Sequence, residues 1–145
     1  MTKDYPDQIL NLKYGIYCRS ANYSEEAIEH QKQVNLAKLK ERENINEEDV
    51  VYYIDNGFPS VKELPPSMKQ LLEDIKDGTV NVVYVYELNR ISRDILKIYE
   101  VKEILDCSDA DFFVVLSNEY LNRGILNNSP YKYFKPDKEP EMEME

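Results

Sequence analysis

Residues 80–105 read VNVVYVYELNR followed by ISRDILKIYEVKEIL, and this stretch decides the fold. Residues 82–86 are all β-branched or aromatic, which predicts a strand buried on both faces of a sheet. Beyond them the spacing changes, because apolar residues recur every three or four positions, as on the inner face of an amphipathic helix. Those residues are Ile91, Ile95, Ile98, Val101 and Leu105. A buried strand that leads into a helix is typical of a parallel α/β sheet.

Polar residues fill the junction between this strand and this helix. Asn89, Arg90, Ser92 and Arg93 lie where the strand ends and the helix begins. Guanidinium groups three residues apart at such a junction can clamp a phosphate. They can equally be surface arginines, one of them paired with a neighbouring carboxylate. Spacing alone leaves both interpretations open.

The rest of the chain repeats the same unit. Strands are predicted at 13–18, 50–55 and 111–116, and helices at 25–42, capped by Ser24, and from about 66 to 77, ended by Gly78. The inner side of the first helix is expected to carry Ala27, Ile28, Val34, Ala37 and Leu39. The order β-α-β-α-β-α-β predicts right-handed crossovers and a mainly parallel sheet with helices on both faces.

In such a sheet, sites lie beyond the carboxyl ends of the strands. Three predicted strand ends supply Arg19, Asp55 and the pair Asn89 and Arg90. We therefore expect these side chains to converge at one edge, which favours a shared site over scattered surface charges.

Length and composition limit the possible functions. The 145 residues suit one domain, predicted at 13–120 between an extension at 1–12 and an irregular, acidic tail at 121–145. The net charge of −10 argues against strong non-specific nucleic-acid binding by this chain alone. A single histidine, His30, argues against zinc sites and histidine-based triads, so neither metal nor cofactor is expected.

The surroundings of the protein can also be predicted. No apolar run is long enough to cross a membrane, and Cys18 and Cys107 show no metal-like spacing, so we expect a cytoplasmic protein with reduced thiols. In the tail, Tyr131, Tyr133 and Phe134 could dock on the domain or on a partner.

These motifs resemble the catalytic domain of the serine recombinases, the family of resolvases, invertases and large serine integrases. The resemblance covers about residues 13–117. Its first signature, Tyr-x-Arg-x-Ser, reads YCRSA at 17–21, so Ala21 stands where the family has its serine. Gln31 matches a glutamine of the first helix, and Asp55 with Gly57 matches the end of the second strand. The arginine signature that ends the third strand reads LNRISRD at 88–94.

The resemblance implies a three-layer fold with a central sheet of about four to five strands, and a metal-free phosphoryl transfer. A family serine attacks a DNA phosphodiester and forms a 5′-phosphoserine link, while arginines stabilise the pentacovalent state. Here Arg19, Arg90 and Arg93 would be those charges, Gln31 would orient the site, and Asp55 or Asn89 would hold or help deprotonate neighbours. The implied partners are DNA and either a second copy or a partner recombinase.

This sequence also departs from the family pattern. Ala21 lacks a nucleophile, Pro65 stands where another arginine is usual, and Asn89 replaces an aspartate. After residue 117 we expect neither the long family helix that builds the dimer nor a separate DNA-binding domain.

Three explanations of Ala21 stay open: an engineered serine-to-alanine change, a natural pseudoenzyme, or use of Ser20 after a one-residue shift. The sequence therefore allows two functions: a recombinase domain that is catalytically inactive, or a non-catalytic acidic module for regulation or protein interaction. A phosphate-binding domain of other ancestry is disfavoured, because the chain has no glycine-rich loop.

Overall fold

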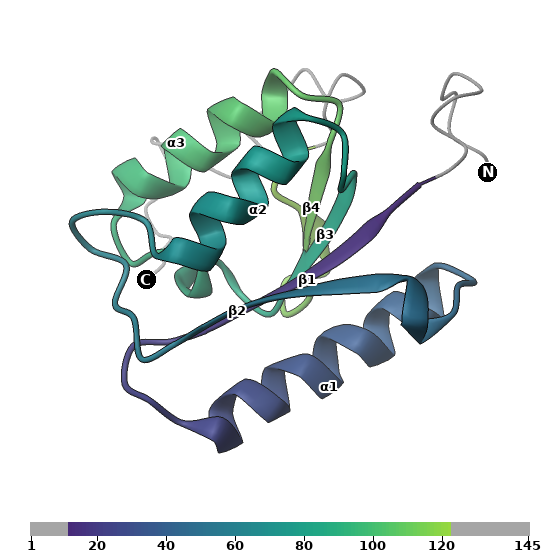
Figure 1. Cartoon of the computed structure of the whole chain (residues 1–145), viewed down its shortest axis with the longest axis horizontal. Helices are drawn as coiled ribbons and strands as arrows, with labels where there is room; N and C mark the ends of the chain where they lie inside the picture. The colour runs from purple at the N-terminus through teal and green to yellow at the C-terminus, as the bar shows by residue number, and fades with distance from the viewer. Residues whose placement is uncertain (1–11, 123–145) are drawn as a thin grey trace.

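The computed structural model describes residues 12–122 and shows an α/β fold. The strands are β1 (Tyr14–Ser20), β2 (Val50–Asn56), β3 (Val82–Val85), β4 (Asp111–Val114) and β5 (Glu119–Tyr120). They form one sheet in the order β2-β1-β3-β4-β5, in which only β5 runs antiparallel to its neighbour. The predicted mainly parallel sheet is confirmed (Figure 1).

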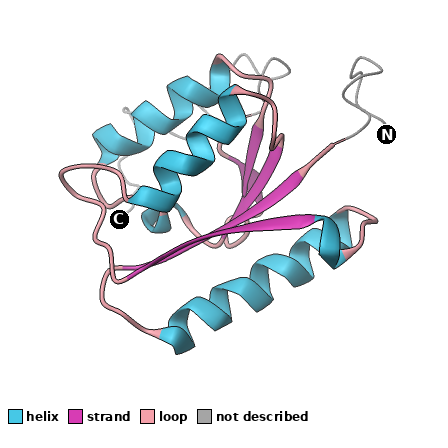
Figure 2. Ribbon diagram, viewed as in Figure 1, coloured by secondary structure: helices cyan, strands magenta, loops and turns pink. Residues whose placement is uncertain are grey.

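Helices cover both faces of this sheet. Helix α1 (Glu25–Arg42) lies on one face, while α2 (Pro66–Lys76) and α3 (Ile95–Asp106) lie side by side on the other (Figure 2). Alternate strand residues therefore enter two separate cores. Ile16 and Tyr84 belong to the core on the α1 side, whereas Tyr17 and Val83 belong to the core beneath α2 and α3. The central strand β1 is buried along its whole length because it lies between both layers.

The deciding stretch folds as expected, except where its strand and helix meet. The strand is β3, but α3 begins at Ile95 and not at Ile91, because a 3-10 turn, Leu88–Arg90, comes first. The hydroxyl of Ser92 accepts the amide of Asp94, and the Asp94 carboxylate then caps α3 at the amide of Leu96. Local polar caps outweigh apolar periodicity here. Ile91 is still fully buried, so periodicity identified its burial but not its conformation.

The expected inner side of α1 is partly wrong. The helix buries Ile28, Gln31, Asn35, Leu36 and Leu39, whereas Ala37 is exposed. The buried stripe follows helical spacing but carries two amides, which hid it from a search for apolar residues. One of these amides, Gln31, holds the end of β1, as described below.

At the end of the described range, Leu121 and Asn122 are buried. The aromatic residues at 131–134, which the sequence suggested could dock on the domain or on a partner, lie outside the described residues. None of the helices between residues 12 and 122 has the length and apolar character that a bilayer span requires.

Candidate functional site at the carboxyl edge of the sheet

Three connections meet where β1, β2 and β3 end, on the left of the sheet in Figure 1. Parallel pairing aligns Arg19 of β1 with Asp55 of β2, and Tyr17 of β1 with Val85 of β3. The segments that leave these strands, residues 21–24, 57–65 and 86–94, therefore start at the same edge. Contacts between them build the candidate site.

Arg19 is the centre of these contacts. Its guanidinium donates to three backbone carbonyls: Nε to Arg90 at 2.7 Å, one terminal nitrogen to Phe58 at 2.9 Å, and the other to Asn89 at 2.7 Å. One side chain on β1 thus ties the loop after β2 to the turn after β3. Burial lowers the pKa of Arg19, and the nearby charges of Arg90 and Arg93 lower it further.

Arg90 and Arg93 supply the other positive charges at this edge. Arg90 donates to the carbonyl of Arg19 at 3.3 Å and pairs with Glu87 at 3.4 Å, with about a quarter of its side chain exposed. Its Nε is buried without a hydrogen-bond partner among the described residues. Arg93 is exposed to solvent. The edge therefore gathers three guanidinium groups, although Glu87 offsets part of their charge.

Gln31 fixes the backbone of Arg19 from the other side of the sheet. Its amide oxygen accepts the Arg19 N–H at 3.1 Å, and its amide nitrogen donates to the Arg19 carbonyl at 2.9 Å. Both groups are buried, so neither can turn to water instead. The orienting role expected for Gln31 stays a prediction, and the contacts seen here hold the main chain of Arg19.

Asp55 is engaged at the start of α2. Its carboxylate accepts the amides of Ser67 at 2.9 Å and Met68 at 3.0 Å, and the hydroxyl of Tyr17 at 2.7 Å. An anion at a helix N-terminus satisfies otherwise unpaired amides and interacts favourably with the helix dipole. Burial and this carboxylate raise the pKa of Tyr17. These contacts join the end of β2 to the start of α2 and to Tyr17 of β1.

Asn89 and the residues around Ala21 complete the edge. The carbonyl of Asn89 binds Arg19, whereas its side-chain oxygen is buried and has no partner between residues 12 and 122. Ala21 is exposed on the loop after β1. The neighbouring Ser20 is buried, and its hydroxyl donates to the carbonyl of Asn22. The loop thus presents a methyl group to solvent and turns its nearest hydroxyl inward.

The sequence analysis named Ser92 at the junction between β3 and α3 but missed its contact with Ser60 in the loop after β2. The Ser92 hydroxyl donates to the carbonyl of Ser60, and both residues are buried. Gly57, at a φ of +91°, turns this loop so that its amide and that of Phe58 both reach the carbonyl of Ser20. Gly57 was a visible signal, but nothing in the sequence marks the contact between the two serines.

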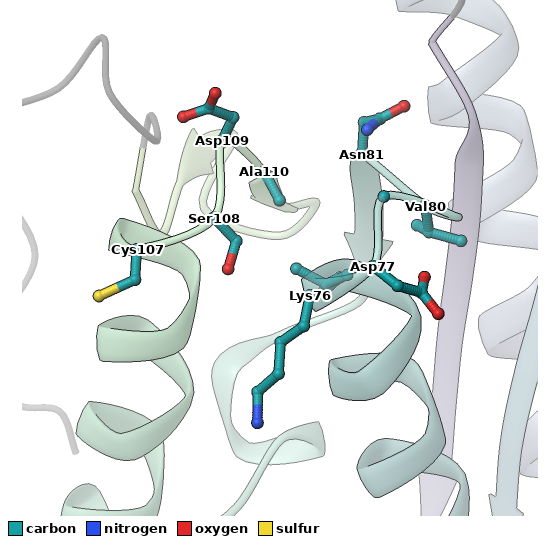
Figure 3. A pocket seen from close by; sticks show the side chains of 10 residues that line it. Lys76, Asp77, Val80, Asn81, Cys107, Ser108, Asp109 and Ala110 are labelled. Atoms are coloured by element: carbon teal, nitrogen blue, oxygen red, sulfur yellow. The ribbon is translucent and has the colours of Figure 1, made fainter.

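A cavity of about 360 Å³ lies at the opposite, amino edge of the sheet, between the ends of α2 and α3. Figure 3 shows that the carboxylates of Asp77 and Asp109 point away from each other there. No group of three or more His, Cys, Asp or Glu side chains within the described range is placed to hold a metal ion. The cavity is therefore separate from the arginine edge.

Comparison with known proteins agrees with this geometry. Residues 15–126 match the family model described as Resolvase, N terminal domain. The crystal structure of the N-terminal catalytic domain of TP901-1 integrase is 25% identical, with a TM-score of 0.67, over 86% of this chain and 90% of that one. A resolvase family site-specific recombinase from Streptococcus pneumoniae shares the fold, at 21% identity and a TM-score of 0.62 over 76% of each chain. No curated protein gives a significant match. The chain belongs to the resolvase N-terminal domain family, the catalytic domains of serine recombinases.

Proposed function

We propose that this protein is a serine-recombinase domain that binds the DNA backbone at its arginine edge. With alanine at position 21, it cannot cleave that backbone. The observation that carries the proposal is Ala21, an exposed methyl group beside Arg19 at the position of the family nucleophile. In the family reaction the serine oxygen forms a bond to phosphorus, the bond from phosphorus to the 3′ oxygen breaks, and that oxygen takes a proton. A methyl group can form no such bond.

The charges for such a reaction are still present. Arg19 uses three of its N–H groups on carbonyls. A guanidinium has five N–H groups, so two of those on Arg19 are not used by these carbonyls. Arg90 and Arg93 lie close enough to lower the pKa of Arg19. Preorganised charge of this kind is the main contribution that a protein makes to phosphoryl transfer without a metal.

Ser20 is a poor substitute nucleophile. Its hydroxyl is already donated to the carbonyl of Asn22, and its own carbonyl accepts two amides from the loop after β2. Turning this hydroxyl outward would break its hydrogen bond to Asn22. We therefore expect the unchanged chain to form no covalent link to DNA.

The test restores the hydroxyl. Ala21→Ser, incubated with a nicked DNA substrate that traps the cleaved strand, should give a covalent protein–DNA adduct, and the unchanged chain should give none. Ala21→Ser combined with Arg90→Ala is the matched control, and we expect its adduct to fall at least about a hundredfold, as when a transition-state donor is lost. An adduct formed by the unchanged chain would overturn the proposal.

A second function is a non-catalytic, acidic regulatory module built on the same fold. The net charge of −10 favours it, because this charge opposes non-specific binding to DNA. Absence of an adduct with Ala21→Ser, together with binding to a partner recombinase in sedimentation, would favour this function over the first.

A further inference from the structure

Two neighbouring apolar side chains are exposed in the first turn of α3. Ile95 is 48% exposed and Leu96 is 66% exposed, immediately after Arg93 and the capping Asp94. We call these two residues the α3 patch. Single exposed apolar residues are common on protein surfaces. This patch is of interest because the last described residue, Asn122, lies at the other end of the same helix.

One flank of α3 connects the α3 patch with the end of the described chain. Ile95, Tyr99, Lys102 and Asp106 follow one another at helical spacing and so lie on the same flank. At the far end, Asp106 accepts the side-chain amide of Asn122 at 3.3 Å, and the same amide donates to the carbonyl of Ala110 at 3.2 Å. Asn122 is buried by these contacts. Asn122, the last described residue, therefore lies at the C-terminal end of the flank whose N-terminal end carries the α3 patch.

The following sequence is long enough to reach the patch. The flank from Asp106 to Ile95 spans about 17 Å at 1.5 Å per residue. An extended chain covers about 3.3 Å per residue, so about five residues are enough to span it. The aromatic sequence YKYF occupies residues 131–134, which begin well beyond that minimum. The aromatic residues are therefore far enough along the chain to reach the α3 patch.

Charge supplies a second, independent match. Residues 137–145 contain five acids and one lysine. Arg93 is exposed and Arg90 is partly exposed directly before the α3 patch. A chain held at the patch through residues 131–134 would carry its acids to these arginines, where opposite charges attract.

We propose that residues 131–134 pack on the α3 patch of the same molecule, and that the acids after them lie against Arg90 and Arg93. The tail then competes with the phosphates of nucleic acid for the arginine edge. Only this competition rests on the proposed function. The packing does not depend on it.

Amide hydrogen exchange of the full-length chain tests the packing. We expect residues 131–134 to exchange at least about tenfold more slowly than an unprotected peptide. Ile95→Ser with Leu96→Ser should remove that protection. The matched control is Val51→Ser, which alters an apolar residue of similar exposure on the edge strand β2 and should keep it. Both variants should retain cooperative unfolding.

Three results would overturn the packing: tail amides that exchange at the unprotected rate, equal loss in Val51→Ser, or protection that grows with protein concentration. The last would mean that a second copy occupies the patch. For the competition, a fluorescent 30-base-pair duplex should bind about tenfold more tightly to Ile95→Ser with Leu96→Ser than to the unchanged chain. Unchanged affinity would refute the competition. Failure of the DNA-cleavage test with Ala21→Ser would leave the exchange result standing, so the two proposals can fail separately.

Discussion

Replacing Arg19 by methionine should destabilise the domain far more than the same change at Arg93. Arg19 donates to carbonyls at 2.7, 2.7 and 2.9 Å that belong to two different connections. Methionine keeps much of the aliphatic volume but has no N–H to donate. Arg93 is exposed, and its side chain makes no hydrogen bond or ion pair with another residue between 12 and 122.

The magnitude follows from these bonds. A hydrogen bond to a charged group contributes about 1.5–3 kcal/mol, so three bonds set an upper limit of about 5–9 kcal/mol. The true loss should be smaller, because a partly opened loop lets water reach the released carbonyls and because the charge of Arg19 no longer has to be buried. We therefore expect a decrease of about 2–4 kcal/mol in the free energy of unfolding for Arg19→Met, against less than about 0.5 kcal/mol for Arg93→Met.

Urea unfolding followed by circular dichroism measures both values. Amide exchange adds a local readout, because the loop at residues 57–60 should exchange faster in Arg19→Met than in the unchanged chain. Equal and small losses in the two variants would refute the reasoning. Arg19 would then not be the tie between two connections that its three hydrogen bonds indicate.

Three more predictions concern buried groups. Gln31→Leu should lower the free energy of unfolding by about 1–3 kcal/mol, because the buried N–H of Arg19 loses its partner and the Arg19 carbonyl keeps only the donor from Arg90. Gln33→Leu on the exposed side of α1 should change stability little. Urea midpoints measure both, and similar losses would count against the buried contact. A thiol reagent at pH 8 should label Cys107 quickly and Cys18 only after unfolding, because burial raises the pKa of Cys18 to about 12; rapid labelling of both thiols in the folded protein would contradict this. The same raised pKa predicts that the protein loses stability in alkali, because the folded state favours the neutral thiol of Cys18. The stabilisation from the neutral thiol is fully present below the ordinary pKa of 9.0. It is lost at about 1.4 kcal/mol per pH unit as the pH rises toward about 12. Buried Tyr17 adds to the effect in the same direction, and a urea midpoint that stays constant between pH 9 and 11 would argue against it.

The position of the site follows from the order of elements, because parallel strands joined by helices end at one edge. That rule needs only the residues at the end of each strand. It correctly predicts that Arg19 and Arg90 lie at the same edge of the sheet. What these side chains bind could not be predicted in the same way. The carbonyls that Arg19 holds belong to loops, whose paths depend on tertiary contacts such as the one between Ser60 and Ser92.

Helix α1 illustrates a different gap between sequence and structure. A search for apolar residues favours Ala37, which is exposed, and passes over Gln31, which is buried. Burying an amide is favourable only if its partners are in place. Those partners are the N–H and carbonyl of Arg19, on another element, so no pattern within the helix could reveal them.

We propose that the alanine at position 21 prevents this recombinase domain from cleaving DNA. The most direct measurement is the fraction of protein joined to a trapped DNA strand after Ala21→Ser, resolved by denaturing gel and located by mass spectrometry. We predict a phosphoserine link at position 21 in this variant and no link in the unchanged chain. A fully folded Ala21→Ser protein that forms no link, under conditions in which it binds the same DNA, would contradict the claim.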